Sequence, residues 1–324
     1  MTYYIGIDIG GTNIKYGIVD EHATILEKGL FPTVINDGEK IIQDIADKVH
    51  ELQNKYEIKA VGVCAPGIVR ADGYMVTGGS IRSFWGINLK SKLEEKINLP
   101  IAVENDGNAL AIAEQWIGNA QGVSNYLVIA LGTAIAGGII IGGNVYRGAH
   151  GAAGEFGWMM QGPLDFSHDL EDACWNNTSG VVAGLYRKYN LALSEAYFES
   201  NSDADFDANS AAPPVHDARV ILDRARQGDV IASRVMDQYY EDVAKGLLNL
   251  IVAYDPELLL LGGGISENEE FLTNLMARID RIKRHHKTIH EMTGITIAEV
   301  LPCKLRNDAG LIGAVYQVMK ATIL

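Results

Sequence analysis

The sequence predicts an α/β protein of two similar lobes with a cleft between them. Its 324 residues are many for a single hydrophobic core and suit two domains of ordinary size. Short apolar strands alternate with helical patterns, which is typical of a mixed α/β fold. Two segments half a chain apart, around Gly11-Thr12 and Gly132-Thr133, both show a strand, a glycine turn and a second strand. Two lobes built on one unit would produce this repeat, although any two β-hairpins with glycine turns look alike.

The first half opens with three strands joined so tightly that we expect antiparallel neighbours. Tyr3–Ile9 and Ile14–Val19 flank the first glycine turn, and Ala23–Phe31 follows closely. Apolar residues then recur at helical spacing from Ile41 to Tyr56. The other elements predicted in this half are the strands Ala60–Cys64 and Ile101–Val103 and the helices Leu89–Ile97 and Asn108–Ile117.

The second half begins with another hairpin and continues mainly as helix. A long helical pattern from His216 to Tyr254 is expected to break near Gly228, and Asp255-Pro256 ends it. Ser194–Pro214 is rich in Asp, Ser, Asn and Ala and predicts an exposed, mobile loop without chemistry. The other predicted elements are the strands Tyr126–Leu131, Ala136–Ile141 and Leu258–Leu261 and a last helix over about Ala309–Met319.

Charge and cysteine content restrict the partners and the compartment. The net charge of −14 argues against a nucleic-acid partner, because phosphate backbones require a basic face. No apolar run reaches the length of a membrane span, and Met1-Thr2-Tyr3-Tyr4 shows no secretory signal. Cys64, Cys174 and Cys303 lie far apart and match neither a disulfide framework nor a zinc motif. These features favour a reducing cytoplasm.

The segment Asp8–Lys15 has the features of a phosphate-binding turn. Gly10-Gly11 lets the backbone approach a phosphate closely and present its N–H groups, and Thr12 adds a hydroxyl donor. Asp8 ends a buried strand, where a carboxylate without a partner is costly, and it can bind Mg²⁺ directly or through water. Lys15 can meet a phosphate or hold Asp8. The alternative is an ordinary hairpin with a surface lysine.

A second polar cluster, Glu104-Asn105-Asp106, stands between a strand and an apolar helix. Asn105 or Asp106 can be the N-cap of that helix, but capping explains one residue and not the cluster. A carboxylate here would face the cleft and could accept a hydroxyl proton as a general base. Phosphoryl transfer otherwise requires mainly positioning and neutralisation of charge.

Two further glycine turns follow apolar strands, at Gly132-Thr133 and at Gly262-Gly263-Gly264. Each can lie against phosphate, ribose or base, and each can equally be a tight turn. Their order along the chain adds weight to the first interpretation.

Taken together, these motifs resemble the ROK family of sugar kinases and related repressors. The match runs through the chain in order, and the set is specific although no single motif is. The motifs that carry the resemblance are Ile7–Lys15, Glu104-Asn105-Asp106, Leu131-Gly132-Thr133, Gly154-Glu155-Phe156-Gly157, Asp255-Pro256-Glu257 with Gly262-Gly263-Gly264, and Asn307–Ala314.

The resemblance implies an actin-like (ribonuclease H-like) ATPase fold with the active site in a central cleft. The expected lobes are residues 1–118 and 119–324, with the helix near 309–319 packing back on the first lobe. The family's activity implies transfer of the γ-phosphoryl group of ATP, with Mg²⁺, to a sugar hydroxyl, and the 6-hydroxyl of a hexose or β-glucoside is the expected acceptor. Family members are often dimers, so a homodimer is among the expected partners.

The resemblance also implies roles for individual residues. Asp106 is the expected catalytic base. The sugar is expected to contact Asn105, Asp106, Glu155, Gly67 and Trp158. ATP and its metal are expected to contact Asp8, Gly10, Gly11, Thr12, Asn13, Lys15, Gly132, Thr133, Gly262, Gly263 and Gly264.

One segment departs from the zinc-binding members of the family. Trp158 stands where those members have a histidine, and Asn176 falls near an expected glutamate. Cys174 and His168 alone cannot complete a four-ligand site, so we expect no zinc. Zinc-less members similar to β-glucoside kinases show a comparable loss, which makes a glycoside acceptor reasonable. Phe84 and Trp85 are expected to add to an aromatic wall around such an acceptor.

Three alternatives stay open or are disfavoured. The repressors of the family carry an N-terminal DNA-binding domain, for which a first strand at Tyr3 leaves no room. A sugar-sensing or structural actin-like protein would lack a usable Asp106 or Glu155, and both are present. A kinase for N-acetylmannosamine or fructose is not separated from a glucose or glycoside kinase by the sequence.

Overall fold

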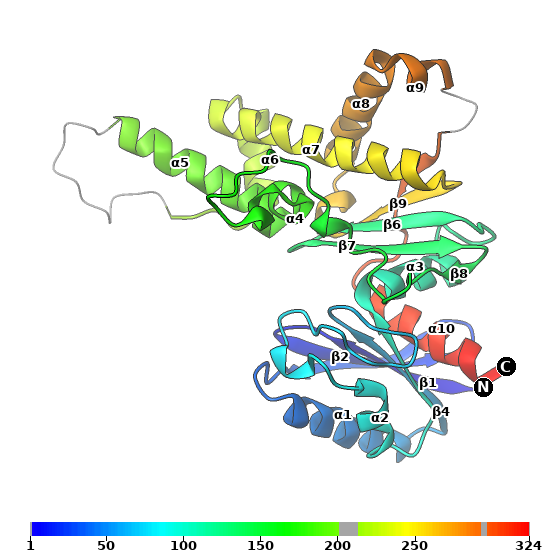
Figure 1. Cartoon of the computed structure of the whole chain (residues 1–324). Coiled ribbons are helices and arrows are strands. Elements are labelled where there is room, and N and C mark those ends of the chain that lie inside the picture. The colour runs from blue at the N-terminus through cyan, green and yellow to red at the C-terminus, as the bar shows by residue number, and fades with distance from the viewer. Residues whose placement is uncertain (1, 201–212, 293–296, 324) are drawn as a thin grey trace.

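The computed structural model describes residues 2–200, 213–292 and 297–323. It contains two five-stranded sheets, stacked one above the other with two helices between them (Figure 1). Residues 201–212, which make up most of the predicted loop Ser194–Pro214, lie outside the described residues.

The first sheet has the strand order β3-β2-β1-β4-β5. β1 (Tyr3–Ile9), β2 (Asn13–Asp20) and β3 (Ile25–Pro32) are antiparallel neighbours, as predicted. β4 (Ile58–Ala65) and β5 (Ile101–Asn105) continue the sheet in parallel with β1. Because parallel strands end at the same edge, the last residues of β1, β4 and β5 meet at one edge.

The second sheet repeats this topology, with the order β8-β7-β6-β9-β10. β6 (Tyr126–Leu131), β7 (Ile135–Ile141) and β8 (Asn144–Val145) are antiparallel. β9 (Leu258–Gly262) and β10 (Glu299–Pro302) run parallel to β6. The repeat read from the two glycine turns is therefore a repeat of whole sheets, and each turn joins the first two strands of its sheet.

Each sheet is covered on both faces. In the first sheet, Ile5 and Ile7 pack toward α1 (Gly38–Gln53) and α2 (Leu89–Glu94). In the second sheet, alternate residues of β6 and β9 pack against the helices of its outer face, where α7 (Val230–Tyr254) is the longest. The other helices of this lobe are α4 (Trp175–Ser179), α5 (Arg187–Ser200), α6 (Ala218–Arg226), α8 (Glu269–His285) and α9 (Lys287–Met292).

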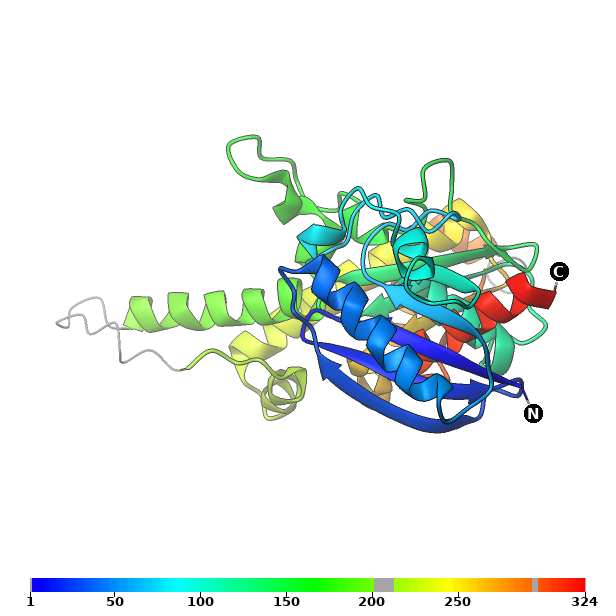
Figure 2. The same ribbon diagram turned by 90° about the horizontal axis from the view of Figure 1, so that it is seen from below.

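Two elements of this lobe bear on the sequence predictions. The break predicted near Gly228 is present, since α6 ends at Arg226 and α7 begins at Val230. The loop prediction is wrong for residues 194–200, which complete α5. Seen from below, α5 projects away from the two sheets (Figure 2). Helix-forming residues such as Leu191, Ala192 and Leu193 lie within this helix, and the Ser and Glu residues that follow do not end it.

The helices α3 (Asp106–Ile117) and α10 (Ala309–Ile323) lie between the two sheets (Figure 1). α10 packs against β1, β4 and α3, so the end of the chain returns to the first sheet. Glycine makes this packing possible, because a Cβ atom at Gly62 would collide with the carbonyl of Ala314, and one at Gly313 with the carbonyl of Ala109. The division into lobes 1–118 and 119–324 stays a prediction.

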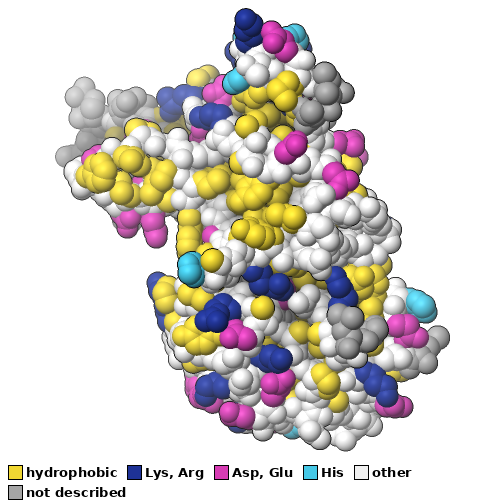
Figure 3. Space-filling view, turned by 45° about the vertical axis from the view of Figure 1, so that its right-hand side comes forward, with side chains coloured by type: hydrophobic (Ala, Val, Ile, Leu, Met, Phe, Trp, Pro, Cys, Tyr) yellow, Lys and Arg dark blue, Asp and Glu magenta, His cyan; other side chains and the backbone are white. Residues whose placement is uncertain are grey.

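The surface gives no sign of a specialised charged face on the side seen in Figure 3, where acidic and basic side chains are interspersed. No helix in the described residues is long and apolar enough to cross a bilayer.

Candidate active site

The end of β1 places Asp8 at the edge where the first sheet meets α10. Lys15 lies opposite Asp8 in the β1–β2 hairpin, and its Nζ is 3.3 Å from Asp8 Oδ2. The same Nζ donates to the carbonyl of Asn307 at 3.3 Å. Gly310, in the first turn of α10, packs directly against the Asp8 carboxyl group, where a Cβ would lie 3.0 Å from Cγ. Of the two roles left open for Lys15, the structure shows the one in which it holds Asp8.

Asn105 and Asp106 form the junction between β5 and α3. Asn105 is the N-cap of α3, since its Oδ1 accepts the N–H of Asn108 at 3.1 Å. Its Nδ2 donates to the carbonyl of Gly67 at 2.7 Å and to Asp106 Oδ1 at 2.9 Å. The N–H of Gly107 also donates to Asp106 Oδ1, at 2.8 Å. The side-chain amide of Asn105 therefore caps α3 and also bonds Asp106 and the Gly67 turn.

The protein environment raises the pKa values of two carboxyl groups, those of Asp106 and Glu155. Asp106 stays accessible from the cleft, yet crowding by protein atoms raises its pKa, and the Asp8 carboxylate adds to this effect. Burial raises the pKa of Glu155 to about 7, and the Asp106 carboxylate adds to the rise. Gly107 and Gly154, the chain neighbours of Asp106 and Glu155, both pack against the carbonyl of Gly137, so the structure brings these two predicted residues near each other. A carboxyl group with a raised pKa is better suited to accept a proton near neutral pH.

The two glycine turns use their first N–H in the same way. The N–H of Gly10 bonds the carbonyl of Asn13 at 3.1 Å, and the N–H of Gly132 bonds the carbonyl of Ala134 at 3.0 Å. These amides close the turns and are not available to a ligand. Within the described residues, the next N–H groups, those of Gly11, Thr12, Thr133 and Ala134, have no hydrogen-bond acceptor. Adjacent exposed N–H groups of this kind suit an anion.

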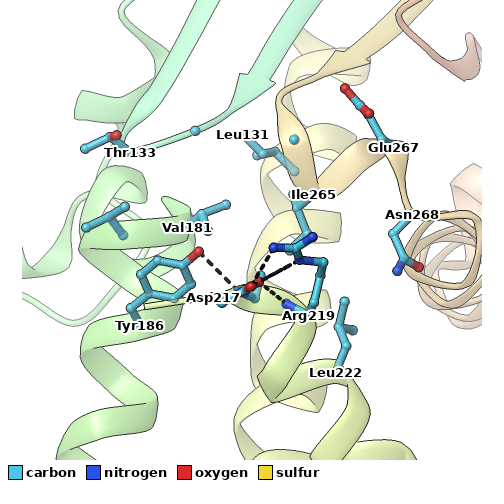
Figure 4. Close-up of a pocket in the computed structure, with 14 residues that line it drawn as sticks. Leu131, Thr133, Val181, Tyr186, Asp217, Arg219, Leu222, Ile265, Glu267 and Asn268 are labelled. Atoms are coloured by element: carbon cyan, nitrogen blue, oxygen red, sulfur yellow. Dashed lines mark hydrogen bonds and ion pairs between the residues drawn. The ribbon is translucent and has the colours of Figure 1, made fainter. Parts of the chain in front are cut away.

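A cavity of about 580 Å³ lies beside the second turn (Figure 4). Its walls combine apolar and polar side chains and come from four parts of the chain: the end of β6, the π-helical segment Val181–Tyr186, α6 with its N-cap, and the segment 264–268. Asp217, the N-cap of α6, pairs with Arg219 at 2.7 Å, and the hydroxyl of Tyr186 accepts the N–H of Ala218 at 3.1 Å. A cavity of this size with apolar and polar groups in its walls is typical of a small-molecule site.

A second cavity, of about 430 Å³, opens between the two lobes. It is lined by Asp8, Lys15 and Asp106 from one side and by Gly262-Gly263-Gly264 and Arg306 from the other. Gly264 lines both cavities, and a Cβ built on it would meet no atom within 4 Å. Gly263 has φ +91°, and a Cβ there would collide with the backbone of Leu131. Gly264 and Glu267 therefore lie where the two cavities adjoin.

A family model described as the ROK family matches residues 4–321 of the chain. The chain belongs to the ROK family.

Individual relatives share this similarity over their whole length. A beta-glucoside kinase from Listeria innocua is 33% identical over 315 residues, which cover 97% of this chain and 96% of that protein. A solved structure from Listeria monocytogenes, described as a candidate N-acetylmannosamine kinase, has a TM-score of 0.79 and 30% identity, with 99% of this chain and all of that chain covered. A ROK glucokinase from Streptomyces griseus, solved with glucose and AMPPNP, has a TM-score of 0.75 and 29% identity, covering 98% and 99%.

These similarities confirm the predicted family, the two-lobed actin-like α/β fold and the enzyme class, an ATP-dependent carbohydrate kinase. The roles of single residues and the identity of the sugar are not tested by them. They are taken up below as proposals.

The segment expected to replace the zinc site of ROK kinases is engaged in protein contacts. Asn176 Oδ1 accepts the N–H of Ile135 at 2.7 Å, and a Cβ at Gly157 would collide with Asn176. His168 pairs with Asp165 at 2.9 Å. The described residues contain no cluster of three or more His, Cys, Asp or Glu side chains able to hold a metal ion. Trp158 is 53% exposed, one 3₁₀ turn after Glu155.

The prediction for Phe84 is wrong, because its side chain is fully buried in the core of the first lobe. Phe84 follows Ile81 in a 3₁₀ turn, and both side chains point into that core. Trp85 is exposed, and its Nε1 donates to the carbonyl of Gly79 at 3.2 Å.

Sequence reasoning missed the walls of the larger cavity and one ion pair. The cavity walls come from Val181, Tyr186 and Leu222, which have no motif of their own. Glu104 forms an ion pair with Arg147 of the other lobe. A signal for this pair exists, since a glutamate at the end of an apolar strand requires a cation, but the sequence does not say which cation.

Proposed function

We propose that this ROK kinase transfers the γ-phosphoryl group of ATP to the 6-hydroxyl of a hexose or β-glucoside, with Asp106 as general base. The observation that carries the proposal is the position of Asp106. It stands at the start of α3, whose Gly107 packs on the same Gly137 carbonyl as Gly154 of the Glu155 segment, and it lines the cavity that Asp8 and the Gly262-Gly263-Gly264 turn also line. An acceptor held by Asp106 and Glu155 would face a nucleotide held by Asp8 and the glycine turn.

The nucleotide half of the proposal rests on the two cavities and the two turns. The larger cavity, beside Thr133, suits an adenosine, and Gly264 leads from it into the cleft. The exposed N–H groups of Gly11, Thr12 and Thr133 would then meet the phosphates from opposite lobes. This arrangement refines the expected set, because the N–H groups of Gly10 and Gly132 close the turns instead.

The residues present also fit a Mg²⁺ ion. Mg²⁺ prefers carboxylate oxygens and water, and Asp8 offers a carboxylate that lines the cleft and retains 21% of its side-chain exposure. Asp8 would hold the ion directly or through water, and Lys15 would orient Asp8. When bound, the ion would neutralise charge on the transferring phosphoryl group.

The acceptor half rests on Asn105, Glu155 and the Gly67 turn. The carbonyl of Gly67 and Asp106 Oδ1 take both N–H donors of the Asn105 amide. Sugar hydroxyls would therefore donate to carboxylate and carbonyl oxygens, chiefly those of Glu155 and Asp106. Trp158 follows Glu155 by one turn and would contribute an aromatic face beside the ring.

In the proposed step, the acceptor oxygen bonds to the γ-phosphorus while the bond from that phosphorus to the β–γ bridging oxygen breaks. ADP leaves, and the hydroxyl proton passes to Asp106. Asp106 Oδ1 already accepts N–H groups from Asn105 and Gly107. In the described residues no donor reaches Oδ2, so Oδ2 is the oxygen available for the proton.

A coupled assay of ADP release tests this function over a panel of acceptors: glucose, mannose, fructose, N-acetylhexosamines, cellobiose and aryl-β-glucosides. Asp106→Asn is the decisive variant, because asparagine keeps the shape but cannot take the proton. We expect kcat to fall at least about 10²-fold, with ATP binding nearly unchanged. A purified variant with the kcat of the wild type would remove Asp106 from the role of base.

The same panel decides between the acceptors that the sequence leaves open. An N-acetylmannosamine kinase is supported by one structural relative and a glucokinase by another. Absence of ADP release with every sugar would instead favour a non-catalytic, sugar-sensing regulator. The cytoplasmic location rests on the cysteine pattern and the homodimer on the family resemblance, and both are part of the same proposal.

A further inference from the structure

Glu104 is a buried carboxylate beside the proposed base. Its side chain is 1% exposed, and it directly precedes Asn105 and Asp106. Glu104 Oε1 accepts the N–H of Asn105 at 3.0 Å and the side-chain Nδ2 of Asn108 at 3.0 Å. The carboxylate therefore holds the β5–α3 junction from its inner side, while it makes no contact that the proposed reaction requires.

The cation for Glu104 comes from the other lobe. Arg147 Nη2 bonds Glu104 Oε2, and the Arg147 side chain is 20% exposed. Arg147 follows β8, and its carbonyl accepts the N–H of Ala153 at 3.2 Å. The turn closed by this bond leads directly to Glu155. One ion pair thus connects the segment that carries Asp106 to the segment that carries Glu155.

Backbone packing brings the same two segments together at Gly137 of β7. A Cβ at Gly107 would collide with the carbonyl of Gly137, and a Cβ at Gly137 would collide with the ring of Phe156. Gly154, with φ +99°, also packs against the Gly137 carbonyl. The start of α3 and the Glu155 segment therefore rest on one point of the second sheet, with the ion pair beside it.

We propose that Arg147 is a positioning residue, which acts through Glu104 to fix Asp106 and Glu155 at the separation the acceptor requires. The inference rests on the proposed function, because it takes Asp106 and Glu155 as the acceptor-binding pair. Arg147 lines neither of the two cavities of the proposed site. Replacing a whole buried ion pair by well-packed apolar residues is often neutral for stability, so stability alone gives little reason for this pair beside the base.

The test compares Arg147→Met with Arg147→Lys and a matched control, Arg70→Met. Arg70 lines the same small surface cavity as Arg147, but its partner is the exposed Asp72 at 3.6 Å. We expect Arg147→Met to raise KM for the sugar, lower kcat, and reduce kcat/KM for the sugar at least about tenfold. KM for ATP should stay within about twofold, because the nucleotide cavity lies elsewhere. Arg147→Lys should recover part of the loss, and Arg70→Met should behave as the wild type.

A second measurement separates positioning from folding. The melting temperature of each variant is recorded, and the double variant Glu104→Gln/Arg147→Met is assayed beside the single ones. If Glu104 and Arg147 act together to position the site, the double variant should lose no more kcat/KM than the worse single variant. A lower melting temperature with wild-type kinetics for Arg147→Met would overturn the inference. Absence of sugar phosphorylation by the wild type would instead overturn the proposed function. The wild type is assayed first, so the two failures are distinguished.

Discussion

Lys15 Nζ lies 3.3 Å from Asp8 Oδ2, and it reaches across to the carbonyl of Asn307 in the segment before α10. One ammonium group therefore connects the first hairpin to the end of the chain. This contact leaves the Asp8 carboxylate on the wall of the interlobe cavity with a fixed orientation. Under the proposed function, Lys15 would orient the carboxylate that holds the metal ion.

Asp8→Asn should weaken the use of Mg²⁺ more than the binding of sugar. We expect the Mg²⁺ concentration for half-maximal rate to rise about 10–100-fold, because the variant loses the charge but keeps the shape. KM for the acceptor should stay within about twofold of the wild type. Asp308→Asn is the matched control, since Asp308 is a carboxylate near the same helix end that pairs with Lys28 at 2.8 Å. An unchanged Mg²⁺ dependence in Asp8→Asn would count against a metal role for Asp8.

The raised pKa of Glu155 predicts how activity depends on pH. The carboxyl group titrates at about 7 in the protein without ligand, and its ionised form is the better acceptor for sugar hydroxyls. kcat/KM for the sugar should therefore rise as pH increases from about 6 to 8. Glu155→Gln should abolish this rise and leave only a lower-pH rise from Asp106, whose pKa is raised from 3.8. A wild-type profile that is flat between pH 6 and 8 would contradict the assignment.

Stability should change with pH in the opposite direction. The pKa of Glu155 is higher in the folded protein than the ordinary value of 4.5, so the neutral form favours folding. Its contribution to the free energy of unfolding is fully present below about pH 4.5 and is lost as pH rises through about 7. Melting temperatures of the ligand-free wild type should thus fall over this range relative to those of Glu155→Gln.

Elemental analysis should find no stoichiometric zinc in protein purified without chelator. Asn176 and His168 already have protein partners, and Cys174 lies within 3.5 Å of the carbonyl of Trp158. A tetrahedral zinc site requires four ligands that these contacts do not supply. One zinc per chain would show that the segment Trp158–Asn176 has been misread.

Glu114 should contribute strongly to the stability of the region where the chain passes between the two sheets. Its carboxylate is fully buried and accepts the N–H of Asn119 at 2.8 Å and of Leu305 at 2.7 Å. These residues belong to the two segments by which the chain passes from one sheet to the other. Glu114→Ala removes both acceptors, and we expect the free energy of unfolding in urea to fall by about 1–3 kcal/mol.

The neighbouring residue provides the control for this measurement. Gln115 makes one side-chain hydrogen bond, to the carbonyl of Gly143 at 2.9 Å, and is partly exposed. Gln115→Ala should cost about 0.5–1.5 kcal/mol at most. Equal losses in the two variants would show that Glu114 has no special place at the crossing.

The parts of the site that could be predicted from the sequence are those made by contiguous residues. Gly10-Gly11-Thr12 and Asn105-Asp106 each follow a strand directly, so local pattern and resemblance place them at a strand end. Their hydrogen bonds were less accessible to prediction. Whether the amide of Gly10 is free or closes the turn depends on the carbonyl of Asn13, which the sequence does not orient.

Contacts between distant segments account for what was missed or wrong. Glu104 and Arg147 are 43 residues apart, and only the packing of α3 on β7 brings them together. Leu222 reaches the larger cavity because α6 lies beside the Val181–Tyr186 segment, an arrangement set by the core of the second lobe. An aromatic residue near the acceptor site suits a sugar, but the side chain of Phe84 is taken up by the core of the first lobe.

The identity of the acceptor gives the last prediction. By the family resemblance, Trp158 is expected to take the place of a histidine found in zinc-binding members, and it is 53% exposed one turn after Glu155. An indole has one N–H donor and a broad apolar face, so it cannot replace an imidazole that both donates and accepts. A site that loses hydrogen bonds to a free anomeric hydroxyl loses part of its preference for a reducing sugar. We therefore expect cellobiose to be phosphorylated with a kcat/KM at least equal to that of glucose.

Two substitutions make this test specific to the indole. Trp158→Ala should lower kcat/KM for cellobiose about 3–10-fold, equivalent to an aromatic contact of about 0.5–1.5 kcal/mol, and change that for glucose much less. Trp85→Ala is the control, because Trp85 is also exposed but already packs beneath Arg82, whose guanidinium is 4.3 Å from its ring. A preference of the wild type for glucose of more than about tenfold, or about 1.4 kcal/mol, would reject the glycoside and leave a kinase of free hexoses. Equal losses for both sugars in Trp158→Ala would place the indole against the ring that both acceptors share.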